Sequence, residues 1–185
     1  MQCMVLRRAA GMLFRPAETF RDINNGSLKD AFLFYAALLL LNAVLSTLLA
    51  FVIMRGVSIG GSVIGGSVWM GLPGAFFGTL VSGFIFLCAG GLLLHLLVGI
   101  VGGGRPINPT FGVLMYGATP YLLLGWIPIA DLIGGVWMIG TVIIGIREVH
   151  GMPARRAMCA GVIWGICAGI AYMALQYGFV SFGRI

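Results

Sequence analysis

The chain has 185 residues, of which 60% are hydrophobic and only 9% are charged, and its mean hydropathy is +1.07. Soluble domains are about 45–50% apolar and about 25% charged, so this composition excludes a soluble globular fold. The net charge of +6 comes from only eleven basic residues, most of them at the ends of apolar segments. That placement favours a role in membrane orientation over nucleic-acid binding.

Residues 1–30 form a basic cytoplasmic or interfacial segment ahead of a membrane domain, residues 31–185. Apolar residues flank Arg7 and Arg8, a pattern typical of a short helix on the membrane surface. Pro16 then favours the start of a second short helix. Because a full-length crossing follows, with no signal cleavage site, we expect the segment to stay attached. Its arginines fit two roles, binding of anionic headgroups and the setting of topology alone.

We predict an all-α, polytopic membrane protein with a bundle of five transmembrane helices. Residues 57–74 are rich in glycine and serine, a composition poor for helices, so we expect an interfacial or re-entrant loop there. A chain reversal around residues 125–128 divides the following apolar stretch into two short crossings. The expected crossings are residues 31–54, 75–101, 110–125, 129–146 and 157–182.

The distribution of basic residues predicts the orientation of these crossings. With a cytoplasmic N-terminus, nine of the eleven basic residues lie in cytoplasmic segments and two lie outside. A sixth helix through residues 57–74 would place the arginines of the 147–156 loop outside and nearly remove this asymmetry. We therefore expect five crossings in the plasma membrane, with the N-terminus in the cytoplasm and the C-terminus outside.

Polar side chains within the predicted crossings are costly in a bilayer unless they are paired. We expect Asn42 and His95 to make interhelical hydrogen bonds, with a ligand contact as the alternative. Asp131 starts the fourth crossing, where we expect it to cap the helix rather than hold a proton or a cation. In the third crossing, Pro120 frees a backbone carbonyl that a neighbour or a hydroxyl must satisfy, so we expect a kink beside Thr119.

Small residues recur every four positions in the fifth crossing, which gives one face of that helix a smooth surface. Such a face suits either dimerisation or packing within the monomer. We favour packing within the monomer, because four other helices need to be covered. The stripe consists of Ala157, Gly161, Gly165 and Gly169.

Enzyme signatures are missing from the sequence: it contains no H-E-x-x-H, no G-x-S-x-G and no Walker-type glycine loop. Five acidic residues and two histidines leave little material for a catalytic acid–base pair. The four cysteines include no C-x-x-C pair. We therefore expect no enzyme, no cofactor and no metal site.

Four strings, in their order and spacing, resemble the Yip1-domain family: RPAETFRDI at 15–23, NPTF at 108–111, YGATPY at 116–121 and IIGIREVHG at 143–151. The resemblance implies five membrane helices and a cytoplasmic N-terminus, in agreement with the charge distribution. Eukaryotic members act in endoplasmic reticulum to Golgi traffic, bind Rab GTPases and form complexes with one another. This chain lacks their long cytosolic N-terminal region and resembles the short prokaryotic form, so Rab binding is not carried over.

Polar sequence concentrates on the predicted cytoplasmic face. Our leading hypothesis is therefore a non-enzymatic membrane-organising or adaptor protein that binds anionic lipids, a membrane-protein partner or a second copy there, and no nucleic acid. The runner-up is a small-solute or ion transporter or channel with a path near Asn42, His95 and Asp131. The candidate binding residues of the first hypothesis are Arg15, Arg21, Arg147, Glu148, His150, Arg155 and Arg156.

Overall fold

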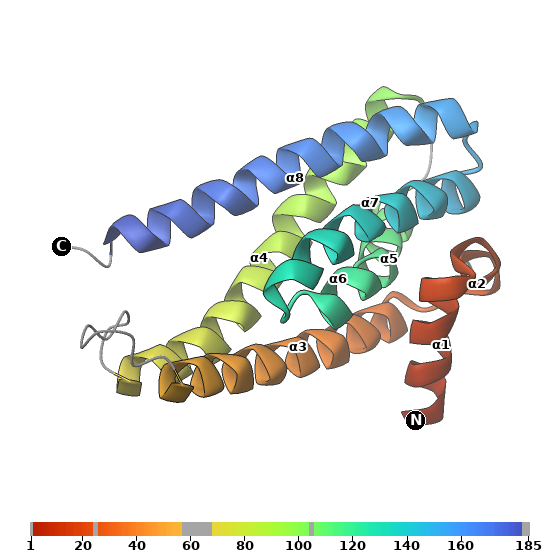
Figure 1. Cartoon of the computed structure of the whole chain (residues 1–185). Coiled ribbons are helices and arrows are strands. Elements are labelled where there is room, and N and C mark those ends of the chain that lie inside the picture. Colours follow the sequence, from red (N-terminus) through yellow and green to blue (C-terminus); the bar gives the residue numbers. More distant parts are fainter. Residues whose placement is uncertain (1, 24–25, 57–67, 104–105, 183–185) are drawn as a thin grey trace.

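The computed structural model describes residues 2–23, 26–56, 68–103 and 106–182. This part of the chain is helical throughout, apart from short connections, as the composition predicted (Figure 1). Two short helices lie where the N-terminal segment predicted them, and six more follow. The helices are α1 (Gln2–Phe14), α2 (Pro16–Ile23), α3 (Leu28–Gly56), α4 (Val68–Ile100), α5 (Ile107–Gly117), α6 (Thr119–Leu124), α7 (Pro128–His150) and α8 (Ala154–Phe182).

Within the described residues, four helices are long and apolar enough to cross a membrane. Only 28–33% of the most apolar window of each is buried within the chain, so most of their side chains face outward, as expected for helices surrounded by lipid. The chain is therefore a multi-pass membrane protein. The candidate spans are Leu28–Val52, Leu72–Ile100, Pro128–His150 and Ala154–Ala171.

The predicted third crossing, residues 110–125, consists of two short helices. α5 has 11 residues and α6 has 6, so neither reaches spanning length alone. The break follows from Pro120, which has no backbone N–H to donate. The Thr119 hydroxyl donates instead to the carbonyl of Tyr116, at 2.6 Å. The predicted kink at this place is confirmed. The described residues contain four helices of spanning length, where the sequence predicted five.

The predicted loop at residues 57–74 is wrong over its second part. α4 begins at Val68 and continues through Pro73, so residues 68–74 are helical. In lipid the backbone must satisfy its own hydrogen bonds, and this requirement outweighs the low helix propensity of glycine and proline. Residues 57–67, the first part of the predicted loop, lie outside the described residues.

The helices gather their charges at one end of the bundle. α3 packs along α4, α5 and α6 run beside α7, and α7 lies beside α8 (Figure 1). The starts of α3 and α8 and the ends of α4 and α7 meet at the end where α1 and α2 also lie. We call this the basic end, because its helices and connections carry eight of the nine basic residues that the structure describes: Arg7, Arg8, Arg15, Arg21, Lys29, Arg147, Arg155 and Arg156.

The small-residue stripe of α8 packs against α7 of the same chain. A β-carbon on Gly161 would overlap the Ile143 side chain, and one on Gly165 would come within 2.6 Å of Cδ1 of Ile139. Ala157 is fully buried. At Gly169, among the described residues, nothing lies within 4 Å of an added β-carbon. The first three members of the stripe therefore serve packing within the monomer.

Candidate functional site

α2 is fixed to the basic end of the bundle by one buried ring. Phe20 is 1% exposed, and its Cζ atom lies 2.8 Å from where a β-carbon on Gly145 of α7 would stand. Val113 of α5 fills the other side of the same space, at 2.7 Å. The glycine therefore lets α2, α5 and α7 meet at one point.

An ion pair adds a polar contact between α2 and α7. The Arg21 guanidinium donates from Nε to Oε2 of Glu148 at 2.6 Å. Nε of Arg147 lies 3.8 Å from the other carboxylate oxygen. Glu148 raises the pKa of Arg21 above its usual value, so this guanidinium stays charged. Two arginines share one carboxylate, which leaves the surface positive.

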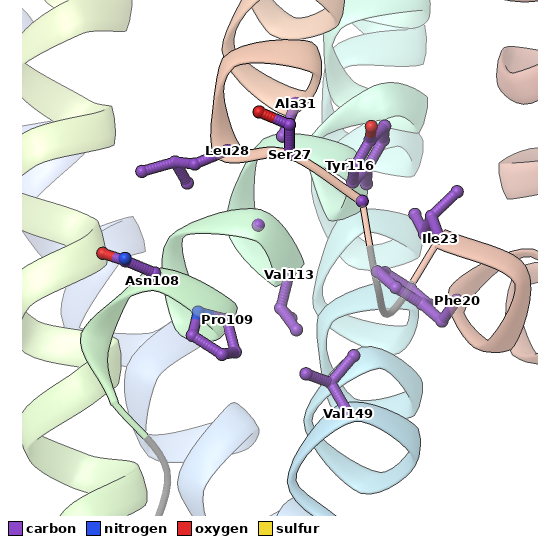
Figure 2. Close-up of a pocket in the computed structure, with 12 residues that line it drawn as sticks. Phe20, Ile23, Ser27, Leu28, Ala31, Asn108, Pro109, Val113, Tyr116 and Val149 are labelled. Atoms are coloured by element: carbon purple, nitrogen blue, oxygen red, sulfur yellow. The ribbon is translucent and has the colours of Figure 1, made fainter.

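A pocket of about 210 Å³ lies beside this contact, between α2, the start of α3, α5 and α7. Figure 2 shows that side chains from all four helices surround it. Its walls are mostly apolar. The ring of Tyr116, the first residue of the YGATPY string at 116–121, forms part of them. The polar lining residues are Ser27, Asn108 and Tyr116. A pocket of this composition suits an amphipathic ligand or side chain.

The two histidines meet through one threonine. The Thr110 hydroxyl lies 3.1 Å from Nδ1 of His95 and 3.2 Å from Nε2 of His150. A hydroxyl has one proton, so it donates to one imidazole and accepts from the other. Thr110 is fully buried and His150 is 9% exposed. His150, predicted as a surface binding residue, therefore lies inside the bundle, where this chain of contacts links α4, α5 and α7.

The three polar residues of the predicted transport path have separate partners. Asn42 donates from Nδ2 to the carbonyl of Leu122 in α6, at 2.8 Å. His95 contacts Thr110, as described above. Asp131 faces Tyr121 of α6. Within the described residues these contacts do not join into one polar path.

The predicted capping role of Asp131 is wrong. Ile127 occupies the N-cap position of α7, and no side chain makes a capping hydrogen bond there. Asp131 lies four residues further on, where its own backbone N–H already donates to the carbonyl of Ile127 at 2.8 Å. Its carboxylate still lies in the first turn, where the helix dipole favours negative charge.

The remaining predicted binding residues are exposed at the basic end. Arg15 lies 3.5 Å from Glu18, and both side chains are largely exposed, so this pair contributes little to stability. Arg155 and Arg156 stand in the first turn of α8 and are exposed. Nη1 of Arg156 lies 3.2 Å from where a β-carbon on Gly102 would stand, so it reaches the turn after α4.

The sequence did not predict how α1 is attached to the bundle. Nη1 of Arg8 donates to the hydroxyl of Tyr116 at 3.4 Å, and Met12 is fully buried. On the outer side of the helix, Leu6 and Phe14 are 71% and 78% exposed. The eight-residue spacing of these two apolar residues places them on one face of a helix. This spacing is the feature of the sequence from which the apolar outer face of α1 could have been predicted. α1 is thus held on one side and presents apolar side chains on the other.

A comparison with known families places this geometry in context. The family model of the Yip1 domain matches residues 10–175. That range includes residues 10–14 at the end of α1, and it includes all of the pocket and histidine contacts described above. No curated protein and no solved structure matches the chain.

Proposed function

Because the chain belongs to the Yip1 domain family, we propose that it is a non-enzymatic membrane-organising protein whose basic end faces the cytoplasm and binds anionic lipids of that leaflet. The concentration of basic residues at one end of the bundle supports this orientation, since such residues are retained in the cytoplasm. The membrane we propose is the plasma membrane.

In this orientation α5 and α6 together form the third of five crossings. From Ile107 to Leu124 they make up a nearly continuous helical path. At 1.5 Å per residue this path is roughly 27 Å long, close to the hydrocarbon thickness of about 30 Å. The N-terminus then lies in the cytoplasm and the C-terminus outside.

The observation that carries the proposal is the outer face of α1. Leu6 and Phe14 are exposed there, and Arg7 and Arg15 directly follow them in the sequence and are also exposed. Apolar side chains that enter the acyl boundary next to cations that meet phosphates are the features of an interfacial helix. Arginines near an anionic leaflet each add an attraction of about 1 kcal/mol.

The proposal is tested by replacing Arg155 and Arg156 together with alanine. The protein is reconstituted in equal parts of phosphatidylcholine and phosphatidylglycerol and extracted with its surrounding lipid by a styrene–maleic acid copolymer, and mass spectrometry gives the lipid ratio. We expect phosphatidylglycerol to be enriched around the wild type. Loss of two cations should weaken its binding roughly tenfold or more.

The matched control removes the same charge from the other side of the membrane. Arg55→Ala/Arg184→Ala should keep the wild-type lipid ratio, because neither arginine belongs to the cluster at the basic end that is proposed to bind lipid. An unchanged ratio in Arg155→Ala/Arg156→Ala would contradict lipid binding. If that variant instead lost a protein partner in a pull-down while its lipid ratio stayed the same, the basic end would be a protein-binding adaptor surface.

A further inference from the structure

An apolar groove of about 330 Å³ lies between α1 and the first half of α3. Every side chain that lines it is apolar, so water in the groove gains no hydrogen bonds from its walls. Alanines on both helices provide the space. The walls include Ala9, Ala10 and Leu13 of α1, Ala37 and Leu41 of α3, and Leu123 of α6.

The groove is fixed in shape before any ligand binds. Met12 is fully buried, and Arg8 donates to the Tyr116 hydroxyl, so α1 is held against the bundle from the side away from the groove. Leu38 of α3 is buried beneath it. A preformed site binds its ligand without the cost of ordering its walls.

Arg7 places a positive charge at the edge of the face of α1 that lines the groove. Arg7 precedes Ala10 by three positions and Phe14 by seven, a spacing that places all three on one side of α1. Arg7 is exposed and forms no ion pair with another residue that the structure describes. An arginine beside an apolar groove matches a molecule with an anionic phosphate and an apolar chain.

We propose that this groove holds one acyl chain of an anionic phospholipid whose headgroup phosphate is bound by Arg7. The assignment rests on the proposed function and adds a defined site to it. α3 is a candidate membrane span and α1 carries the outward apolar residues, so lipid chains reach the groove from the bilayer itself. A neutral headgroup would use the same groove but would gain less from Arg7.

The test fills the groove without disturbing the core. Ala37 and Ala10 are both exposed, so Ala37→Phe and Ala10→Phe should fold and occupy the space of the chain. Native mass spectrometry of the full-length protein in detergent measures retained phosphatidylglycerol and, separately, phosphatidylcholine. We expect one tightly retained phosphatidylglycerol in the wild type and about tenfold lower retention in each filled variant.

Two further variants test whether the loss of lipid is specific to the groove and to Arg7. Ala89→Phe adds the same ring to an exposed position of α4 outside the groove and should retain lipid as the wild type does. Arg7→Ala should lower retention of phosphatidylglycerol to the level of phosphatidylcholine. Wild-type retention in Ala37→Phe, or an equal loss in Ala89→Phe, would overturn the assignment. A shift from dimer to monomer in Ala37→Phe, without lipid loss, would identify a second copy as the occupant and also overturn it.

The outcomes also distinguish a failure of the groove assignment from a failure of the proposed function. If Ala37→Phe keeps its lipid while Arg155→Ala/Arg156→Ala loses phosphatidylglycerol enrichment, the groove assignment is wrong and the proposed function stands. If the wild type shows no preference for phosphatidylglycerol in either experiment, both are wrong.

Discussion

Replacing Gly161 with leucine is expected to destabilise the protein by about 1–3 kcal/mol, because the larger side chain must displace Ile143 from the contact between α7 and α8. The same change at Gly165 meets Ile139, 2.6 Å from an added β-carbon, and should have a similar effect. Thermal unfolding of the purified protein in one detergent measures both. The transition temperatures of Gly161→Leu and Gly165→Leu should fall.

Gly169 provides the matched control within the same stripe. An added β-carbon there meets no described atom within 4 Å, so Gly169→Leu should unfold at the wild-type temperature. If Gly161→Leu left stability unchanged and instead dissociated a dimer, the stripe would be a dimer face. The packing of α8 on α7 within one chain would then be the wrong interpretation.

Replacing Thr110 with valine is expected to lower stability by about 2 kcal/mol, since it removes the hydroxyl that both histidines contact. Valine has nearly the shape of threonine, so the cavity contribution is small. The loss falls on imidazole nitrogens of the half-buried His95 and the buried His150. For a buried group a missing partner costs more than the hydrogen bond itself contributes. The same thermal measurement tests the change.

Thr110→Ser is the control for this variant, because it keeps the hydroxyl and removes only a methyl group. Its stability should lie nearer to that of the wild type than to that of Thr110→Val. Equal losses in the two variants would show that the methyl group, not the hydroxyl, stabilises the site. His95→Phe in the Thr110→Val background should then add little, because their contact is already lost.

Features that depend on local chemistry could be predicted from the sequence. Long apolar stretches predicted the bodies of α3, α7 and α8, because the bilayer sets their length. Pro120 predicted the break between α5 and α6, because a missing N–H has a local consequence. The order of short strings along the chain predicted the Yip1 domain, which the family comparison confirms.

Features that depend on distant contacts could not be predicted. Asn42 and its acceptor Leu122 are 80 residues apart, and Thr110 and His150 are 40 residues apart. The sequence identified Asn42 and His95 as costly in lipid but gave no means to choose among many possible partners. His150 was therefore predicted as a surface residue, although it is buried in the bundle.

Helix boundaries were predicted wrongly where the requirement for backbone hydrogen bonds in lipid outweighs helix propensity. Glycine and proline between Val68 and Gly74 predicted a loop, but that segment is the first part of α4. The predicted capping role of Asp131 was wrong for a related reason. Its position near a helix start predicted a cap, and a difference of four residues from the N-cap places its carboxylate beside Tyr121 instead.

The orientation of the basic end decides the proposed function most directly. With Cys3, Cys88, Cys159 and Cys167 replaced by alanine, a single cysteine is introduced at the exposed Ala154, the first residue of α8. Intact cells and cells with a permeabilised membrane are then treated with a membrane-impermeant maleimide. We expect Ala154→Cys to be labelled only after permeabilisation. Equal labelling in intact cells would place the basic end outside the cytoplasm and contradict the proposed function.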